Sequence, residues 1–154
     1  MERASDRELV IRRVFRARPS LVFDAMTKPE LLRRWWAPRS LGVELFDVEA
    51  DVRVGGRYRY VFGRANEPTM AFSGVYREVV HGVRVVYTQI FEPMPNTGDG
   101  VITSTFEEVP GGTLLVSREL YPSKEVLDGA IASGMERGMR ETLEQLEALL
   151  PELA

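Results

Sequence analysis

The sequence predicts an α+β domain in which a curved antiparallel sheet of about six to seven strands wraps around a long C-terminal helix. Apolar and polar residues alternate through most of residues 43–121, which is the period of strands with one buried face. After residue 123 the apolar residues recur every three or four positions, as in an amphipathic helix. A run of antiparallel strands needs one face covered, and the terminal helix is the only element long enough to cover it.

The N-terminal part is expected to form one strand and two short helices. Residues 9–15 alternate well enough for a strand, and residues 19–27 carry apolar side chains at helical spacing. A second short helix is expected to start at Pro29, to be capped by Thr27 and to run through Trp36.

Six further strands are expected, each bounded by Gly, Pro, Asn or Asp: Val43–Val48, Tyr58–Phe62, Met70–Val80, Val83–Phe91, Val101–Val109 and Thr113–Tyr121. The dipeptide His81-Gly82 and the tripeptide Pro110-Gly111-Gly112 are tight-turn signals that join neighbouring strands as hairpins. Residues 92–100 are rich in turn residues and are expected to be a loop.

The final helix is expected to begin after a Ser123 cap and to end at Pro151, with one apolar face over about seven turns. Gly134 and Gly138 lie inside this helix, where each glycine costs roughly 1 kcal/mol relative to alanine. Two compensations remain open: a close approach of the sheet, or space for a ligand against the helix.

Composition predicts one globular domain over residues 1–154 and argues against several classes of protein. No apolar run reaches the roughly 18 residues of a membrane helix, and the N-terminus has no apolar signal-peptide core. The chain has no cysteine, so we expect no disulfides, no thiolate metal site and a cytoplasmic location. The net charge is −3 and no basic stripe is visible, so neither nucleic acid nor membrane is an expected partner.

Several stretches, in this order and spacing, resemble a known family. They are Val14-Phe15-Arg16-Ala17, Val22-Phe23-Asp24-Ala25, Thr27-Lys28-Pro29-Glu30-Leu31-Leu32-Arg33-Arg34-Trp35-Trp36, Gly55-Gly56-Arg57-Tyr58, Phe72-Ser73-Gly74-Val75-Tyr76-Arg77-Glu78-Val79, Gly111-Gly112-Thr113 and Gly134-Met135. Together they resemble the activator of heat-shock-protein-90 ATPase homologue family, within the START-related (SRPBCC) superfamily, over roughly residues 8–150.

This resemblance implies a helix-grip fold with a hydrophobic cavity and implies little about chemistry. The superfamily includes lipid carriers, polyketide cyclases and hydroxylase subunits. The matched stretches do not include the separate N-terminal domain with which the eukaryotic co-chaperone binds its chaperone. We therefore do not expect the ATPase-activating function to carry over, because fold-level analogy is only an associational argument.

The candidate ligand-binding residues are those expected to point into the cavity: Trp36, Tyr58, Tyr60, Phe62, Phe72, Tyr76, Tyr87, Gln89, Phe106, Arg118, Met135 and Met139. Aromatic rows suit a cavity wall, although the same residues could form plain core. Trp35 is the expected core residue of the Trp35-Trp36 pair, which leaves Trp36 free to gate a cavity mouth. Gly74 would leave room for a bulky neighbour or a ligand, and Gln89 could orient a ligand.

The register of the last strand stays open, because either Leu114, Val116 and Arg118 or Leu115, Ser117 and Glu119 could face inward. An unpaired buried charge would cost several kcal/mol. Whichever of Arg118 and Glu119 lies inside is therefore the best ligand-binding or acid/base candidate.

The search for catalytic groups is mostly negative. His81, the single histidine, precedes Gly82 in a turn, so neither a Cys–His nor a Ser–His arrangement is expected. No spacing typical of metal ligands occurs, and no cofactor is expected.

The leading hypothesis is a binding domain for a small hydrophobic or aromatic molecule. One alternative is a protein-interaction domain that, like the co-chaperone, uses an exposed apolar patch to bind a chaperone or another protein. Another is a cavity enzyme of cyclase or hydrolase type, with a tyrosine and a carboxylate as acid/base groups. Homodimerisation, through an exposed strand edge or the cavity mouth, is a further expectation without a specific sequence signal.

Overall fold

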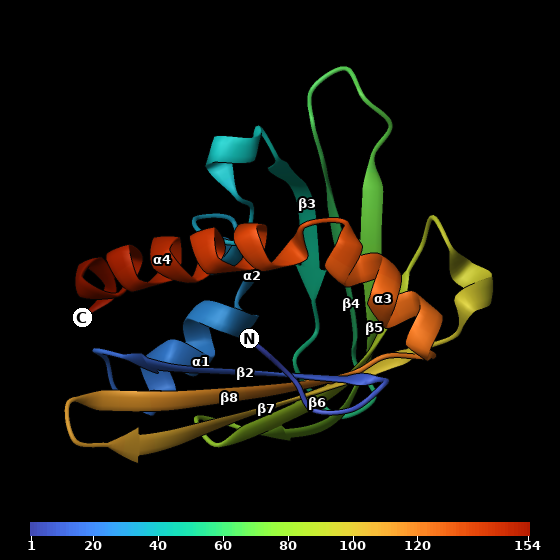
Figure 1. The fold of residues 1–154 in the computed structure, drawn as a ribbon. Helices are drawn as coiled ribbons and strands as arrows, with labels where there is room; N and C mark the ends of the chain where they lie inside the picture. Colours follow the sequence, from blue (N-terminus) through green and yellow to red (C-terminus); the bar gives the residue numbers. More distant parts are fainter.

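The computed structural model describes residues 1–154, with four helices on the concave face of one curved sheet (Figure 1). The elements are β1 (Glu2–Arg3), β2 (Glu8–Phe15), α1 (Pro19–Thr27), α2 (Pro29–Leu32), the 3-10 helix η1 (Arg39–Leu41), β3 (Glu44–Ala50), β4 (Arg57–Gly63), β5 (Met70–Val80), β6 (Arg84–Phe91), the 3-10 helix η2 (Pro95–Thr97), β7 (Gly100–Val109), β8 (Gly112–Leu120), α3 (Lys124–Ala132) and α4 (Met135–Leu153). No helix is long and apolar enough to span a membrane.

The sheet has eight antiparallel strands in the order β1-β2-β8-β7-β6-β5-β4-β3. Its strong curvature is visible in Figure 1, where β3, β4 and β5 stand upright while β2, β7 and β8 run across them. The ladders β3–β4 and β5–β6 each contain a register shift, and such bulges increase the bend of a strand. The curvature produces the concave face that receives the helices.

The predicted strands are confirmed, each with ends within two residues of those expected. The hairpin turns at His81-Gly82 and Pro110-Gly111 are also confirmed, and both glycines have a positive φ, of 73° and 91°. The sheet has eight strands and not the expected six to seven, because the two-residue strand β1 forms an additional edge strand next to β2.

The first short helix has the predicted bounds, but the second is shorter than predicted. α2 ends at Leu32, and the chain then tightens through i→i+3 bonds such as Arg34 N–H to the Leu31 carbonyl, 3.0 Å. A proline follows at position 38, and the residue before a proline is disfavoured in helical conformation. The expected Thr27 cap is wrong, because the Thr27 hydroxyl donates instead to the Phe23 carbonyl of its own helix at 2.8 Å.

The C-terminal helix is broken into two pieces, which the sequence pattern does not predict. Ser123 caps α3 as expected, because its hydroxyl accepts from the Val126 N–H at 3.2 Å. Gly134 then adopts a left-handed conformation, with φ 84°, and separates α3 from α4. The sheet does not approach Gly134, and Gly138 packs against Pro38 and against Leu41 of η1, so the predicted close approach of the sheet is wrong. Space for a ligand against the helix stays a prediction.

The prediction that Pro151 ends the helix is wrong, because α4 continues to Leu153 with Pro151 inside it. Proline removes one backbone N–H and so one helical hydrogen bond. Pro151 is exposed and lies in the last turn of α4, so the helix tolerates the lost hydrogen bond and continues for two more residues.

The densest packing lies where α1 and α4 cross the sheet. Phe15, Val22, Ala25 and Leu146 are fully buried there, and Leu115 of β8 is 1% exposed. In the other half of the concave face, by contrast, some inner side chains, such as Tyr60, Tyr87 and Glu119, are only partly buried. The core therefore fills one half of the concave face and leaves the other half less tightly packed.

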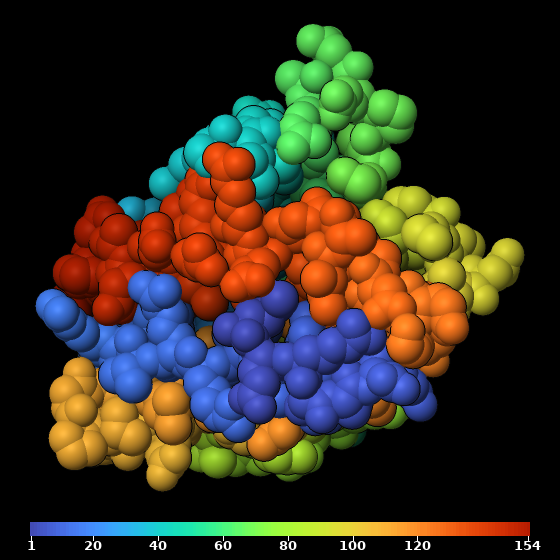
Figure 2. Space-filling view, viewed as in Figure 1, coloured from blue at the N-terminus to red at the C-terminus, as the bar shows by residue number.

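The N-terminal segment closes this second half from outside. In Figure 2 the first residues (dark blue) lie against α3 (orange), and Arg3 pairs with Asp128 of α3 at 2.7 Å. α3 is also anchored by Leu127, which is fully buried. The helix that covers the loosely packed half is thus held by a small number of contacts.

Candidate functional site

All five tyrosines of the chain face the interior between the sheet and the helices. Four of them, on β4, β5 and β6, form one ring cluster. The Tyr58 ring lies 5.1 Å from Tyr60, 5.6 Å from Tyr76 and 5.3 Å from Tyr87, between ring centroids. These strand positions share a face because Tyr58 pairs with Gly74, two residues before Tyr76, and Tyr76 pairs directly with Tyr87.

Trp36 packs over one end of this cluster. Its ring lies edge-on to Tyr60 and Phe62, with centroid distances of 5.5 and 5.1 Å, and Phe62 stacks on Phe72 at 5.2 Å. Trp35 is core, as predicted: it is 5% exposed, and its Nε1–H donates to the Ala25 carbonyl at 2.8 Å. The two adjacent tryptophans therefore divide between core and cluster, as predicted, although they lie in the turn after α2 and not on a helix.

Gly74 is explained by a close approach within the cluster. A Cβ added at this position would lie 1.9 Å from the Thr88 carbonyl oxygen and 2.8 Å from the Tyr58 ring. The Tyr58 hydroxyl donates to that same carbonyl at 2.6 Å. The room left by Gly74 is thus filled by the neighbouring strand and ring, which was one of the two predicted uses.

The interior contains a narrow void of about 20 Å³, lined by Met26, Thr27, Tyr60, Tyr76, Val85, Tyr87, Ser104 and Phe106. That volume suits roughly one water molecule. A ligand-sized cavity, expected from the family resemblance, is therefore not open in this conformation.

Several tyrosines are nevertheless deep without being tightly enclosed. Tyr60 and Tyr87 keep part of their surface accessible, yet desolvation raises their pKa well above the usual 10.0. Desolvation also raises the pKa of Tyr76 to about 12. Tyr60, Tyr76 and Tyr87 also line the narrow void, and the part of the interior around this void is called the hollow below.

The register of β8 places Glu119 inside and Arg118 outside. Leu115 and Ser117, on the Glu119 face, are 1% and 7% exposed. The expectation that Arg118 lines the interior is wrong, because its side chain is half exposed and pairs with Glu8 at 3.5 Å.

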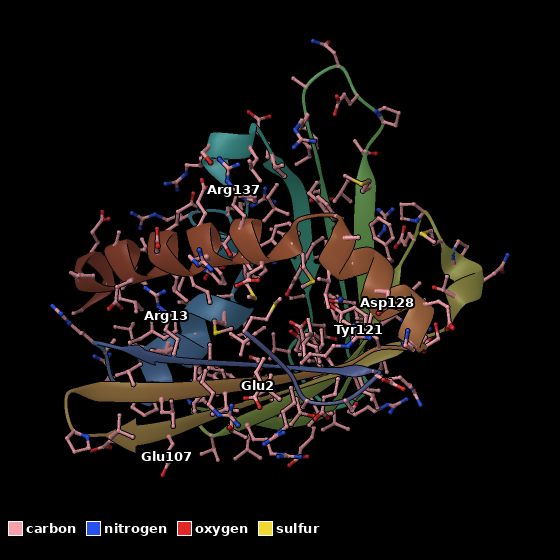
Figure 3. All side chains as sticks on the ribbon, viewed as in Figure 1. Glu2, Arg13, Glu107, Tyr121, Asp128 and Arg137 are labelled. Atoms are coloured by element: carbon pink, nitrogen blue, oxygen red, sulfur yellow. The ribbon has the colours of Figure 1, made fainter.

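Glu119 is hydrogen-bonded by Tyr121, a residue that the sequence reasoning did not propose. The Tyr121 hydroxyl donates to Glu119 Oε1 at 3.0 Å and lies 3.6 Å from the Met135 sulfur. Figure 3 shows Tyr121 beneath α3, near Asp128 and far from Arg13 at the other end of the interior. Tyr121 continues the alternation of Ser117 and Glu119, so the period of the strand was the signal that could have identified it.

The remaining predicted residues lie around the same interior. Phe106 is buried in the wall, Gln89 is two residues along β6 from Tyr87 and partly exposed, and Met135 and Met139 are partly buried on α4. Of the predicted set, only Arg118 is placed outside.

Other polar features lie away from this hollow. A groove of about 390 Å³ runs between α4 and residues 34–39, but its groups largely bond one another, as in the 3.1 Å pair of Arg34 and Glu152. His81 pairs with Asp24 at 2.8 Å on the surface. No group of three or more His, Asp or Glu side chains is arranged to hold a metal ion.

Comparisons with known proteins agree with this architecture. A family model described as activator of Hsp90 ATPase homolog 1-like protein matches residues 16–151. A crystal structure from Rhodobacter sphaeroides superposes with a TM-score of 0.90 at 26% identity, covering 98% of this chain and 97% of that one.

Two further solved structures are similar over nearly their whole length. A protein from Chromobacterium violaceum is 30% identical, with a TM-score of 0.82 and coverage of 95% of this chain and 98% of that one. A solution structure from Staphylococcus epidermidis is 28% identical, with a TM-score of 0.82 and coverage of 99% and 94%. No curated protein matches the chain.

Proposed function

Since the chain belongs to the activator of Hsp90 ATPase homolog 1-like family, with its START-like fold, we propose that it binds a small hydrophobic or aromatic molecule between the sheet and the helices α3 and α4. The proposed contacts are Trp36, Tyr60, Tyr76, Tyr87, Met135 and Met139. The single observation that carries the proposal is the cluster of tyrosine rings on β4, β5 and β6, which surrounds the narrow interior void.

Binding requires the hollow to open, because its present void of about 20 Å³ holds no aromatic ring. We propose that α3 moves to open it, because the left-handed Gly134 separates α3 from α4. Arg3 and Asp128 tie α3 to the N-terminal segment through a partly exposed ion pair, and such pairs contribute about 1 kcal/mol or less. Opening on this side breaks this ion pair and exposes Leu127, which is fully buried in the closed form.

The test is an NMR titration with 2-(2-naphthyl)ethanol, a neutral aromatic probe. We expect shifts at the Trp36 indole N–H and at the amides of Tyr76, Tyr87 and Met135. A Ser104→Leu variant fills the void from the buried wall and should weaken binding about tenfold or more.

Thr105→Leu is the matched control, because Thr105 is the next residue on β7 and points to the other face of the sheet. This variant should bind as the wild type does. A titration without shifts, or with shifts confined to the groove between α4 and residues 34–39, would contradict the proposal.

A second candidate function is acid/base catalysis in the same hollow, and the inward Glu119 is the observation that favours it. Burial raises the pKa of this carboxyl, which makes the carboxylate a stronger base. The aromatic ketone 2-tetralone tests this function in D₂O, because abstraction of a proton next to its carbonyl and return of a deuteron leave a measurable mass change. Exchange above the uncatalysed rate that disappears in Glu119→Gln would support catalysis; equal rates would contradict it.

A further inference from the structure

Glu119 is an acidic group on the inner face of the sheet, with one strand between it and Tyr87 of the hollow, and it has no cationic partner. On the concave face its register neighbours are Leu9 of β2 and Ile102 of β7, and Ile102 is in turn paired with Tyr87. Its hydrogen-bond partner is the neutral Tyr121 hydroxyl, at 3.0 Å. One strong acceptor therefore lies on a wall that is otherwise apolar and aromatic.

The nearby guanidinium groups are all engaged elsewhere. Arg118 pairs with Glu8 on the outer face, and the exposed Arg7 donates to the Tyr121 backbone carbonyl at 2.9 Å. Arg13 lies over the Phe15 ring, 5.4 Å from its centroid, and Figure 3 shows it far from Tyr121. Desolvation accordingly raises the pKa of Glu119, and the Tyr121 hydrogen bond only partly opposes this rise.

The rest of the hollow also favours positive charge. Desolvation is the main cause of the raised pKa of Tyr58, Tyr76 and Tyr87, and a carboxylate adds to each rise. The carboxylates are Asp99 for Tyr58, Asp51 for Tyr76 and Glu119 for Tyr87. These carboxylates thus contribute a negative potential at the three tyrosines. Tyrosine ring faces attract cations within about 6 Å by about 0.5–2 kcal/mol, more strongly when water is excluded.

We propose that the hollow selects ligands that carry a protonated amine on an aromatic or apolar body, with the amine at Glu119 and Tyr121 and the body among the tyrosines of β4, β5 and β6. The inference rests on the proposed binding function and adds the charge of the ligand. A protonated amine supplies the missing counter-charge for the carboxylate and a cation for the ring faces. An anionic ligand would meet an unpaired acid in a desolvated site, which is strongly unfavourable.

Three probes of matched shape test the inference: 2-(2-naphthyl)ethylamine, 2-(2-naphthyl)ethanol and 2-naphthylacetate. At pH 7 the amine should bind at least about tenfold more tightly than the alcohol, and the acid should bind most weakly. Glu119→Gln should weaken binding of the amine about tenfold, so that its affinity becomes similar to that of the alcohol for the same variant. Arg118→Gln, the adjacent outward residue, should preserve the ranking.

The outcomes separate the two proposals. If the alcohol binds and the amine binds no more tightly, or if Glu119→Gln keeps the preference for the amine, the selectivity is overturned while the binding function stands. If none of the three probes binds, the proposed function and this inference both fall.

Discussion

The Tyr58 hydroxyl donates to the Thr88 carbonyl across a strand position, Gly74, that has no side chain. This hydrogen bond requires glycine at position 74, because a Cβ there would lie 1.9 Å from the Thr88 carbonyl oxygen. A glycine that sequence reasoning associates with ligand space is therefore part of the internal structure of the sheet.

Replacing Tyr58 by Phe removes this hydrogen bond and leaves a buried carbonyl without its partner. We expect the free energy of unfolding to fall by about 1–3 kcal/mol. Urea denaturation followed by circular dichroism measures the change. Tyr87→Phe is the control, because Tyr87 lines the void and its hydroxyl makes no hydrogen bond within the protein. Equal losses in both variants would show that the hydrogen bond of Tyr58 is not the cause.

Glu119→Gln should change how stability depends on pH. The folded-state pKa of Glu119 is raised above 4.5, so the folded protein holds this proton to higher pH than the unfolded chain does. Wild type and variant should therefore be closest in stability below pH 4.5, and the wild type should lose stability relative to Gln as the pH rises through the raised pKa. Thermal unfolding of wild type and Glu119→Gln, measured from below pH 4.5 upward, tests this prediction, with Arg118→Gln as the control. A difference in stability between wild type and Glu119→Gln that does not change with pH would contradict it.

Among the elements, α3 and α4 provide a matched pair of glycines. Gly129 is exposed within α3, whereas Gly134 has φ 84° between the helices, and neither has a neighbouring atom within 4 Å of an added Cβ. Gly129→Ala should stabilise the protein by roughly 1 kcal/mol through helix propensity. Gly134→Ala should destabilise it by about 1–2 kcal/mol, because an L-residue is strained in that conformation.

Chemical denaturation of both variants compares the two substitutions directly. Space is available at both sites, so opposite signs can arise only from backbone conformation. Destabilisation of similar size in both variants would mean that the junction between α3 and α4 is not determined by the left-handed residue.

The strands were predictable because alternation directly reports which face of a strand is buried. Met70–Val80 has the predicted bounds, and the other strands differ by at most two residues. The break in the C-terminal helix was not predictable in the same way. Gly134 and Gly138 look alike in sequence, and only the three-dimensional packing shows which of them leaves the helix.

The site was predicted in part for a related reason. Aromatic rows such as Tyr58 and Tyr60 identify the inner face, but both faces of β8 carry apolar residues, so local sequence left Arg118 and Glu119 as alternatives. Pairing with β7 and β2 decides between them. The size of the hollow depends on how α3 rests on the sheet, which no local pattern encodes.

Across the whole molecule, distant parts of the chain form one structural unit. β2 pairs with β8, and α4 packs on α1 across the same core. Contacts between segments so far apart in sequence cost more chain entropy to form, so folding is expected to be slow relative to a helical bundle of this size. The same contacts connect the tightly packed and the loosely packed halves of the concave face.

All five tyrosines of the chain lie in the interior, and this placement determines how the stability of the fold changes at alkaline pH. Desolvation raises the pKa of every one of them above 10.0, so none should ionise in the folded protein at the pH where all five ionise in the unfolded chain. Stability is thus fully present below pH 10.0 and lost above it, as the unfolded chain releases up to five protons that the folded one retains.

An alkaline titration should therefore show phenolate absorbance rising in one steep step, at the same pH at which circular dichroism reports loss of the sheet. Gradual phenolate formation in a protein that is still folded would contradict this. The tyrosine cluster that lines the hollow thus also acts as an optical reporter of the global integrity of the fold.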